Sequence, residues 1–277
     1  MRTRFRALAA LALGGALFLG VAMPAAADSH QAMVRAAHLI PDAPAVDVLV
    51  NGDVVLEGVT FKAVSDYLMV DAGTYTISIN QAGTATELLK IDAPVESGMA
   101  YTVAAIGTLD AADTEDPRLT AYVDDPVASS DTAKLRVIHA SPTTPAVDVN
   151  LKGAAAADAP VKNLAFPDAT DYLSLPGGTY DFVVYPTGGD PASPALDLSG
   201  TALENGKNYT VFAVGLLAGT GDQALGVVVT VDGTLPDSAT ESVPAGTSPI
   251  LLVGLVALSI LGVGLAFGRR LGTVGTK

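Results

Sequence analysis

Two histidines occupy equivalent places in this sequence, and each is followed nine residues later by an aspartate. The pairs are His38 with Asp47 and His139 with Asp148. A histidine beside a carboxylate can ligate a metal ion or carry out acid–base chemistry near neutral pH. A metal site needs three or four ligands, however, and the only other histidine in the chain is His30. We therefore keep these four residues as candidates only, and expect no catalytic residue, no metal site and no cofactor.

The two histidines also have a structural interpretation. Alternation along a strand places His38 in line with Val34 and Ala36, on an apolar face. We expect each histidine to be buried, with a hydrogen bond to a neighbouring strand or to a loop such as 41–44.

The two aspartates alternate with valines in the sequence. We expect Asp47 and Asp148 either to face solvent or to pair with the arginines of the same repeats, Arg35 and Arg136. An exposed Arg–Asp pair contributes only about 0–1 kcal/mol.

Four carboxylates gather in the stretch 110–116, namely Asp110, Asp113, Glu115 and Asp116. Carboxylate oxygens suit Ca²⁺, but the spacing lacks the glycine and the terminal glutamate of an EF-hand loop. The corresponding stretch 218–222 keeps one acid. We favour a solvated loop, with a calcium site as the alternative.

Tyr101 and Tyr209 each follow a glycine by three residues and open an apolar run. This arrangement is similar to the tyrosine corner of immunoglobulin-like sandwiches, in which the hydroxyl ties a loop to a strand. The chain has no nucleophile elbow, P-loop, dinucleotide fingerprint or zinc-protease motif.

An internal duplication organises these residues. The stretch 34–48 recurs at 135–149, an offset of 101, and later matches lie at offsets of 105 and 108. Short loop insertions between retained strands explain the growing offset. We place one module at 33–127 and the other at 133–235, joined at 128–131.

Hydrophobic periodicity inside each module is two rather than 3.6. Tyr75, Ile77 and Ile79 alternate with polar residues, and Asn51-Gly52 supplies a hairpin turn. Six to eight short strands in about 95 residues predict an all-β fold of two tandem antiparallel β-sandwich modules of the immunoglobulin-like kind.

Both ends of the chain differ from this pattern. Residues 1–27 combine three early arginines, an apolar run and an Ala-Ala-Ala stretch, which is typical of a secretory signal peptide. After a linker at 236–248, residues 249–268 are long and apolar enough for a transmembrane helix. Arg269 and Arg270 would then hold the tail 269–277 in the cytoplasm.

These ends predict an exported protein of the cell membrane, single-pass, with the modules outside. The stretch 235–239 also resembles a sortase sorting signal, with Ser238 in place of the usual threonine and Ala239 in place of glycine. The alternative is therefore covalent attachment to the cell wall after cleavage behind Ser238. The expected partners are the membrane, a cell-wall polymer or other surface proteins.

Composition excludes several classes of function. The net charge is −14, and all 29 acidic residues lie between Asp28 and Glu241. Such a surface repels phosphates, so we expect no nucleic-acid partner. The chain contains no cysteine, which excludes disulfides, a thiol nucleophile and thiolate metal ligands.

The phrase Arg-x-x-His-x-x-Pro-x-x-Pro-Ala-Val-Asp-Val, followed by Asp-Tyr and Gly-Thr-Tyr, appears in both modules. It resembles the bacterial and archaeal family called domain of unknown function 4397. The resemblance covers roughly 200 residues and implies exported, surface-displayed β-sandwich domains, often in tandem. It implies no activity and no catalytic residue.

These observations favour a non-enzymatic structural, spacer or adhesion protein of the cell surface. A module that binds glycan or peptide through loops at the sandwich ends is one alternative. A module that binds calcium through the acidic loop is the other.

Overall fold

The structure is a computed structural model that describes residues 31–110 and 115–234. The predicted signal peptide, the linker at 236–248, the apolar segment at 249–268, the tail and Asp113 lie outside these ranges. Within them, no helix has the length and apolar character needed to cross a membrane. All described strands belong to one compact unit.

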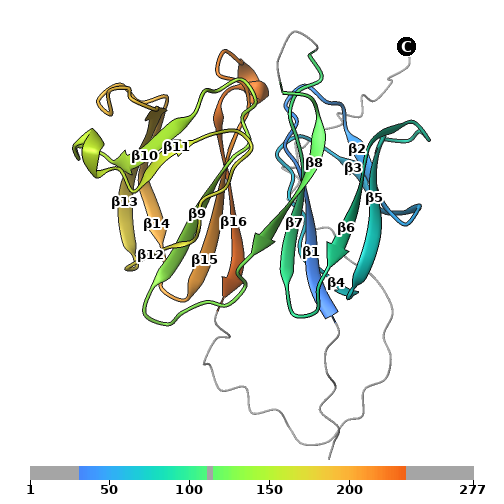
Figure 1. The fold of residues 1–277 in the computed structure, drawn as a ribbon. Helices are drawn as coiled ribbons and strands as arrows, with labels where there is room; N and C mark the ends of the chain where they lie inside the picture. Colours follow the sequence, from blue (N-terminus) through green and yellow to red (C-terminus); the bar gives the residue numbers. More distant parts are fainter. Residues whose placement is uncertain (1–30, 111–114, 235–277) are drawn as a thin grey trace, which may run out of the picture. The chain divides into compact units, whose positions relative to one another are not determined.

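The first module contains eight strands, arranged in two four-stranded sheets (Figure 1). The strands are β1 (Gln31–His38), β2 (Val46–Val50), β3 (Asp53–Val59), β4 (Leu68–Asp71), β5 (Gly73–Gln81), β6 (Glu87–Val95), β7 (Ala100–Ile106) and β8 (Arg118–Asp124). One sheet has the order β4-β1-β7-β8 and the other the order β3-β2-β5-β6.

The second module repeats this plan. Its strands are β9 (Ala133–His139), β10 (Val147–Leu151), β11 (Val161–Leu164), β12 (Leu173–Leu175), β13 (Gly178–Pro186), β14 (Leu196–Leu203), β15 (Lys207–Val214) and β16 (Gly226–Thr234). The sheets have the orders β12-β9-β15-β16 and β11-β10-β13-β14. Two 3₁₀ turns, η1 (Ala156–Asp158) and η2 (Gly221–Gln223), are the helical elements of the described residues. The predicted all-β fold of two repeated modules is confirmed.

The growing offset between the repeats has the predicted cause. The connection between β10 and β11 is longer than that between β2 and β3 and holds η1. The connection between β13 and β14 is likewise longer than that between β5 and β6. Insertions therefore fall in loops, and the strands are retained.

The hairpin between β2 and β3 turns at the predicted pair. Asn51 has φ 53° and Gly52 has φ 93°. Both residues are left-handed, as a two-residue turn requires if it is to match the twist of the flanking strands.

The described strands pair antiparallel as predicted, except for one parallel pair in each module, which the prediction missed. β1 pairs with β7 in parallel, with Val34 opposite Tyr101, and β9 pairs with β15 in parallel, with Leu135 opposite Tyr209. Parallel neighbours need a long crossover connection. Here the whole second sheet of each module lies between the two paired strands in sequence.

Apolar side chains from both sheets of the first module meet in one core. Val46, Val48 and Ile77 come from one sheet and Val103 and Ala105 from the other. Such a core between two sheets is the defining feature of a sandwich.

The sheets β4-β1-β7-β8 and β12-β9-β15-β16 are called the inner sheets, because they also pack on each other. Ala37, Ile106 and Tyr122 of the first module share a cluster with Ile138 and Phe212 of the second. Figure 1 shows β7 and β8 on the side of the first module toward β9, β15 and β16. An inner sheet is thus covered on both faces, which explains why β7 is buried at every position and, apart from Thr102, consists of apolar residues.

Candidate functional site

Both candidate histidines are buried and have structural partners. His38 and His139 are 2% and 0% exposed. Nε2 of His38 donates to the carbonyl oxygen of Pro44 (3.3 Å), and Nε2 of His139 donates to that of Pro145 (3.1 Å). Burial lowers the pKa of both rings, so the neutral form is favoured. The predicted role in holding the proline loop is confirmed.

The candidate aspartates bond to backbone amides and a hydroxyl of neighbouring segments rather than to arginines. Asp47 accepts hydrogen bonds from the amides of Gly58 and Gly83, both at 2.8 Å, and these bonds lower the pKa of its carboxyl. Asp148 accepts from the amide of Asn163 (2.8 Å) and the hydroxyl of Thr187 (2.9 Å). Exposure of the two is only 9% and 7%. The expectations of a solvent-facing position and of pairing with Arg35 or Arg136 are both wrong, because amides of β3, of β11 and of the turn at Gly83, together with the Thr187 hydroxyl, take the carboxylates.

The two members of each His–Asp pair take different partners. The histidine bonds to the loop that follows β1 or β9, and the aspartate bonds to an amide of the neighbouring strand β3 or β11. Among residues 31–110 and 115–234, no group of three or more His, Asp or Glu side chains is placed to hold a metal ion.

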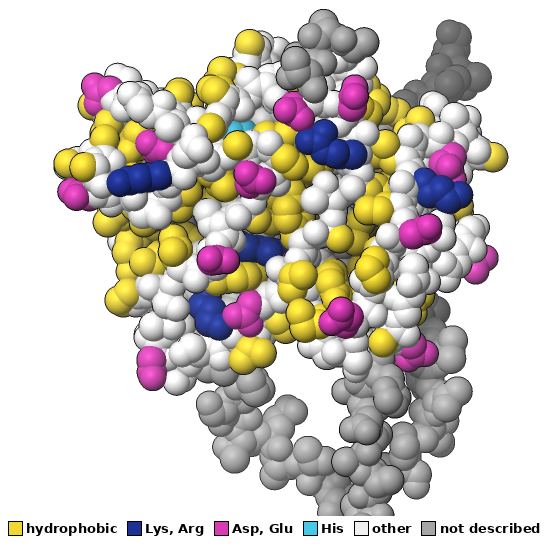
Figure 2. All heavy atoms as spheres, in the orientation of Figure 1, with side chains coloured by type: hydrophobic (Ala, Val, Ile, Leu, Met, Phe, Trp, Pro, Cys, Tyr) yellow, Lys and Arg dark blue, Asp and Glu magenta, His cyan; other side chains and the backbone are white. Residues whose placement is uncertain are grey.

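The described part of the acidic stretch 110–116 bonds within the protein. Glu115 accepts a hydrogen bond from the guanidinium of Arg118 at 3.0 Å. The carboxylate of Asp42 accepts from the amides of Leu109 and Asp110. Figure 2 shows acidic side chains spread over the visible face, with no single dense patch.

A different set of side chains gathers on the facing sides of the inner sheets. In the first module, Nε of Arg35 on β1 donates to Thr102 on β7 at 2.8 Å. Thr102 in turn donates to Asp124 on β8 at 2.6 Å, and the hydroxyl of Tyr67 donates to the same carboxylate at 2.6 Å. The guanidinium of Arg35 lies over the Tyr67 ring, 4.6 Å from its centroid.

The second module repeats this arrangement at equivalent positions. Arg136 donates to Thr210 at 2.7 Å, Thr210 donates to Asp232 at 2.5 Å, and Tyr172 donates to Asp232 at 2.6 Å. Arg136 lies over the Tyr172 ring at 4.9 Å. Burial and the neighbouring carboxylate raise the pKa of both tyrosines, which keeps each hydroxyl protonated as a donor.

Each arginine pairs with the aspartate of the other module. Nη2 of Arg35 donates to Asp232 at 2.5 Å, and Nη2 of Arg136 donates to Asp124. None of these four residues is more than 5% exposed. Two positive and two negative charges thus cancel in a buried space, where an ion pair is screened little. We call these four residues, with Thr102, Thr210, Tyr67 and Tyr172, the reciprocal cluster.

Other contacts between the modules surround the reciprocal cluster. The hydroxyl of Tyr122 donates to the carbonyl oxygen of Pro167 at 2.8 Å. Nζ of Lys62 donates to that of Asp222 at 2.8 Å. Together with the shared apolar cluster, these bonds fix the position of one inner sheet on the other.

The segment between the modules is also hydrogen-bonded to the second module. Asn208, which is buried on β15, donates through Nδ2 to the carbonyl oxygens of Asp125 (2.7 Å) and Val127 (2.9 Å). Lys134 bonds to the Asp125 carboxylate at 2.6 Å. The residues just before the predicted connection at 128–131 are therefore hydrogen-bonded to the second module.

Sequence reasoning missed the reciprocal cluster, although its signal was present. The matched Arg35 and Arg136 belong to the repeated phrase. Asp124 and Asp232 lie at the offset of 108 that already relates Tyr101 to Tyr209. Extending the alignment by one more strand would have paired these two acids as equivalent residues.

The repeat corresponds to a known protein family. The profile described as a domain of unknown function, DUF4397, matches residues 32–150 and again residues 133–243. No curated protein matches the chain. The two matches together span both modules and every residue of the reciprocal cluster. The chain therefore belongs to the DUF4397 family, of which it carries two tandem copies.

Proposed function

We propose that this protein is a non-enzymatic structural element of the cell surface, in which two sandwich modules act as one rigid spacer. The reciprocal cluster is the observation that carries the proposal. Each arginine donates a hydrogen bond to an aspartate of the other module, so separating the modules breaks both bonds and exposes four buried charges. Within the first module Arg35 also lies 3.7 Å from Asp124.

Rigidity follows from the energetics of buried charges. Breaking a buried ion pair by removing one partner costs about 3–5 kcal/mol, because an uncompensated charge stays behind. Hydrogen bonds from threonine and tyrosine further fix the direction of each carboxylate. Modules joined only by a flexible connection would move freely, whereas this interface permits one arrangement.

The surface location rests on the sequence of the two ends. A signal peptide at 1–27 would export the chain, and an apolar helix at 249–268 would hold it in the membrane. Cleavage behind Ser238 would instead attach it to the wall. In either case the modules, with their immunoglobulin-like tyrosine corners, would stand between the anchor and a wall polymer or surface-protein partner.

Distance measurements between the modules test rigidity. Because the chain has no cysteine, Ala85→Cys and Ser193→Cys place one exposed label in each module without competing thiols. Double electron–electron resonance on the full chain should give one narrow distance distribution. The same pair in an Arg136→Met background should give a broader one. A broad distribution in the parent chain contradicts a rigid spacer.

Mass spectrometry of the protein from intact envelope tests the anchor. A retained membrane helix gives a mature chain that still contains residues 249–268, and sortase processing gives a C-terminus at Ser238 linked to wall material. An intact chain recovered only from the culture medium contradicts both forms of anchoring.

Hydrolase screening of the full chain tests the non-enzymatic assignment. We expect no turnover above background. A robust turnover that disappears in His38→Ala or His139→Ala would overturn the assignment.

A further inference from the structure

The last strand of the second module, β16, forms a free edge of its inner sheet. β16 pairs with β15 on one side, and no backbone hydrogen bond joins its other side to any part of residues 31–110 or 115–234. A free edge presents a row of N–H and C=O groups that can pair with a strand of another chain. The chemistry of this edge therefore favours a β-strand as its partner.

Most other sheet edges carry features that oppose such pairing. β4, β11 and β12 are very short, with four, four and three residues. β3 and β14 are irregular, because their registers shift against β2 and β13. β6 contains Lys90 and Pro94. Short strands, irregular pairing, lysine and proline are means by which proteins prevent contacts between edges.

The equivalent strand of the first module, β8, differs from β16 at its start. Arg118 begins β8 at the position that Gly226 occupies in β16. Pro117 precedes Arg118, whereas Leu225 precedes Gly226. From Gly226 to Val231 the sequence of β16 contains neither a charge nor a proline. The second module therefore lacks a protection that the first module has at this edge.

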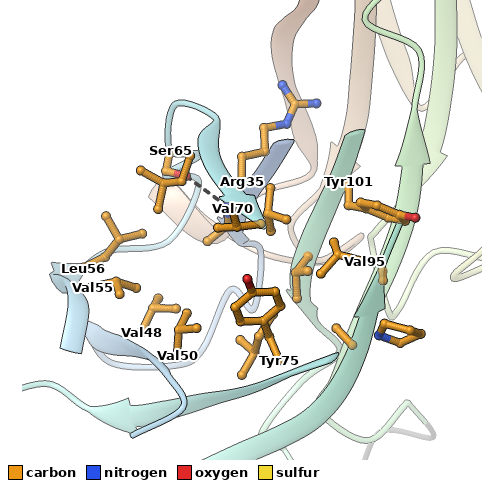
Figure 3. Close-up of a pocket in the computed structure, with 18 residues that line it drawn as sticks. Arg35, Val48, Val50, Val55, Leu56, Ser65, Val70, Tyr75, Val95 and Tyr101 are labelled. Carbon is orange, nitrogen blue, oxygen red and sulfur yellow. Dashed lines mark hydrogen bonds between the residues drawn. The ribbon is translucent and has the colours of Figure 1, made fainter. Parts of the chain in front are cut away.

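Each inner sheet has a core face and an interface face. Figure 3 shows this division in the first module, where Val70 lies beside the space between the sheets and the Arg35 guanidinium points away from it. Alternation gives β16 the same two faces. Val227 packs in the core of the second module, and Asp232 belongs to the reciprocal cluster on the interface face.

The core face of β16 extends beyond the part that the second module covers. Val229 and Val231 follow Val227 on this face, but they are 52% and 43% exposed. Pairs of β-branched side chains on neighbouring strands stabilise a sheet. A row of valines beside a free edge therefore matches a partner strand that carries its own row of β-branched residues.

We propose that the partner is β16 of a second copy of this chain, paired antiparallel about a two-fold axis at Val229. In this register Val229 faces its own copy, and Val227 faces Val231 of the other chain in both directions. Three valine pairs then lie on one face. Such a contact uses the same surface on both chains and closes as a dimer.

The other residue pairs of this register are compatible with it. Val228 faces Thr230, and Asp232 faces Gly226, so no like charges are opposed. An axis at Thr230 would instead place Val228 against Asp232 and would break the row of valine pairs. The sequence of the strand is thus self-complementary about Val229.

The dimer joins two four-stranded inner sheets through their edges and leaves the reciprocal cluster inside each chain. One strand from each chain makes a smaller contact than a typical stable interface, so the dimer should be weak and depend on concentration. The inference does not rest on the spacer function.

Disulfide trapping of the full chain in detergent micelles tests the pairing. The chain has no cysteine, so Val229→Cys introduces a single thiol. Directly opposed residues have Cβ atoms about 4.5–5.5 Å apart, near the distance that a disulfide requires. Mild oxidation should crosslink Val229→Cys chains at least about tenfold faster than Ala121→Cys chains. Ala121 is the matched control, because it has the equivalent position on β8.

Two further cysteines test the direction of the strands. Val231→Cys alone should crosslink slowly, because this residue faces Val227 of the other chain. A mixture of Val231→Cys chains and Val227→Cys chains should give the mixed dimer. Fast crosslinking of Val231→Cys alone would indicate a parallel pair and contradict the proposed register.

A lysine at the edge tests whether the edge itself makes the contact. Val231→Lys in the Val229→Cys chain should slow crosslinking at least about tenfold, since a charge on an edge strand opposes pairing. Val123→Lys in the same chain should leave the rate unchanged, because Val123 is equally exposed but lies on β8. Unchanged melting temperatures show that both lysine variants are folded.

Three results would overturn the proposal. The first is crosslinking of Val229→Cys no faster than that of Ala121→Cys. The second is unchanged crosslinking in the folded Val231→Lys variant. The third comes from hydrogen exchange of the parent chain, in which protection of the amides at 226–231 should rise with protein concentration. Full protection at the lowest concentration would mean that another segment of the same chain covers the edge.

Discussion

Arg136 and Asp124 are buried side chains of opposite charge that belong to different modules. Arg136→Met should destabilise the chain by about 3–5 kcal/mol, because Asp124 loses the arginine that donates to it and Arg35, 3.7 Å away, is left to balance two buried aspartates. Urea denaturation measures the change. The exposed pair of Lys152 and Asp197 supplies the control, since Lys152→Met should hardly alter the midpoint.

The double variant Arg136→Met/Asp124→Leu separates charge from packing. Removing both charges should recover much of the stability lost in the single variant. Equal losses in single and double variants would show that packing, not pairing, dominates at this position.

The two histidines predict a dependence of stability on pH. Burial lowers the pKa of His38 and His139 in the folded chain, whereas the unfolded value is about 6.5. Between the lowered pKa and about 6.5 the unfolded chain binds more protons, so stability falls as the pH falls through this window. The slope approaches about 1.4 kcal/mol per pH unit for each histidine.

Denaturation midpoints between pH 7 and pH 5 measure this effect. A His38→Gln/His139→Gln variant retains an amide donor for each proline carbonyl and should lose less stability over that range. Parallel pH profiles for parent and variant would show that other groups govern the response.

At the scale of elements, the tyrosine corners join each parallel strand to the turn before it. The hydroxyls of Tyr101 and Tyr209 accept hydrogen bonds from the amides of Glu96 and Glu204, both at 3.2 Å. Tyr209→Phe should cost about 1 kcal/mol in unfolding free energy, since it leaves that amide without its acceptor. Tyr180→Phe removes an exposed hydrogen bond to Pro176 and should cost less. Equal costs would argue against a special role for the corner.

Much of each module could be predicted from local pattern. Alternation identified β5, and Asn51-Gly52 identified the turn between β2 and β3. Strand direction could not be predicted in the same way, because a period of two is identical in parallel and antiparallel neighbours. The placement of β1 between β4 and β7 depends on packing of the whole module.

The site was harder to predict than the strands. Asp232 lies 197 residues from Arg35, and no local rule joins residues so far apart. The sequence offered Asp47 as one possible partner of Arg35, but the amides of Gly58 on β3 and Gly83 in a turn give that carboxylate two fixed donors. Pairing between modules is a property of the folded interface and not of either repeat alone.

At the scale of the molecule, the shared cluster of the inner sheets should make the modules unfold together. Calorimetry of the parent chain should show one transition, with equal calorimetric and van't Hoff enthalpies. Asp232→Ala removes the hydrogen-bonded partner of Arg35, leaves Asp124 to balance two buried arginines, and should separate the transition into two. Two resolved transitions in the parent would mean that the interface contributes little to the cooperative unfolding of the two modules.

The reciprocal cluster also makes it important whether the number of repeats in a chain is even or odd. Each inner sheet offers an arginine and an aspartate and needs the same two groups from its neighbour, so the face is self-complementary. An even number of repeats satisfies every such face within one polypeptide. A third repeat fused to this chain would leave one face unmatched, and two such chains would cover it by pairing with each other. The count of repeats would then decide whether chains pair through their inner faces.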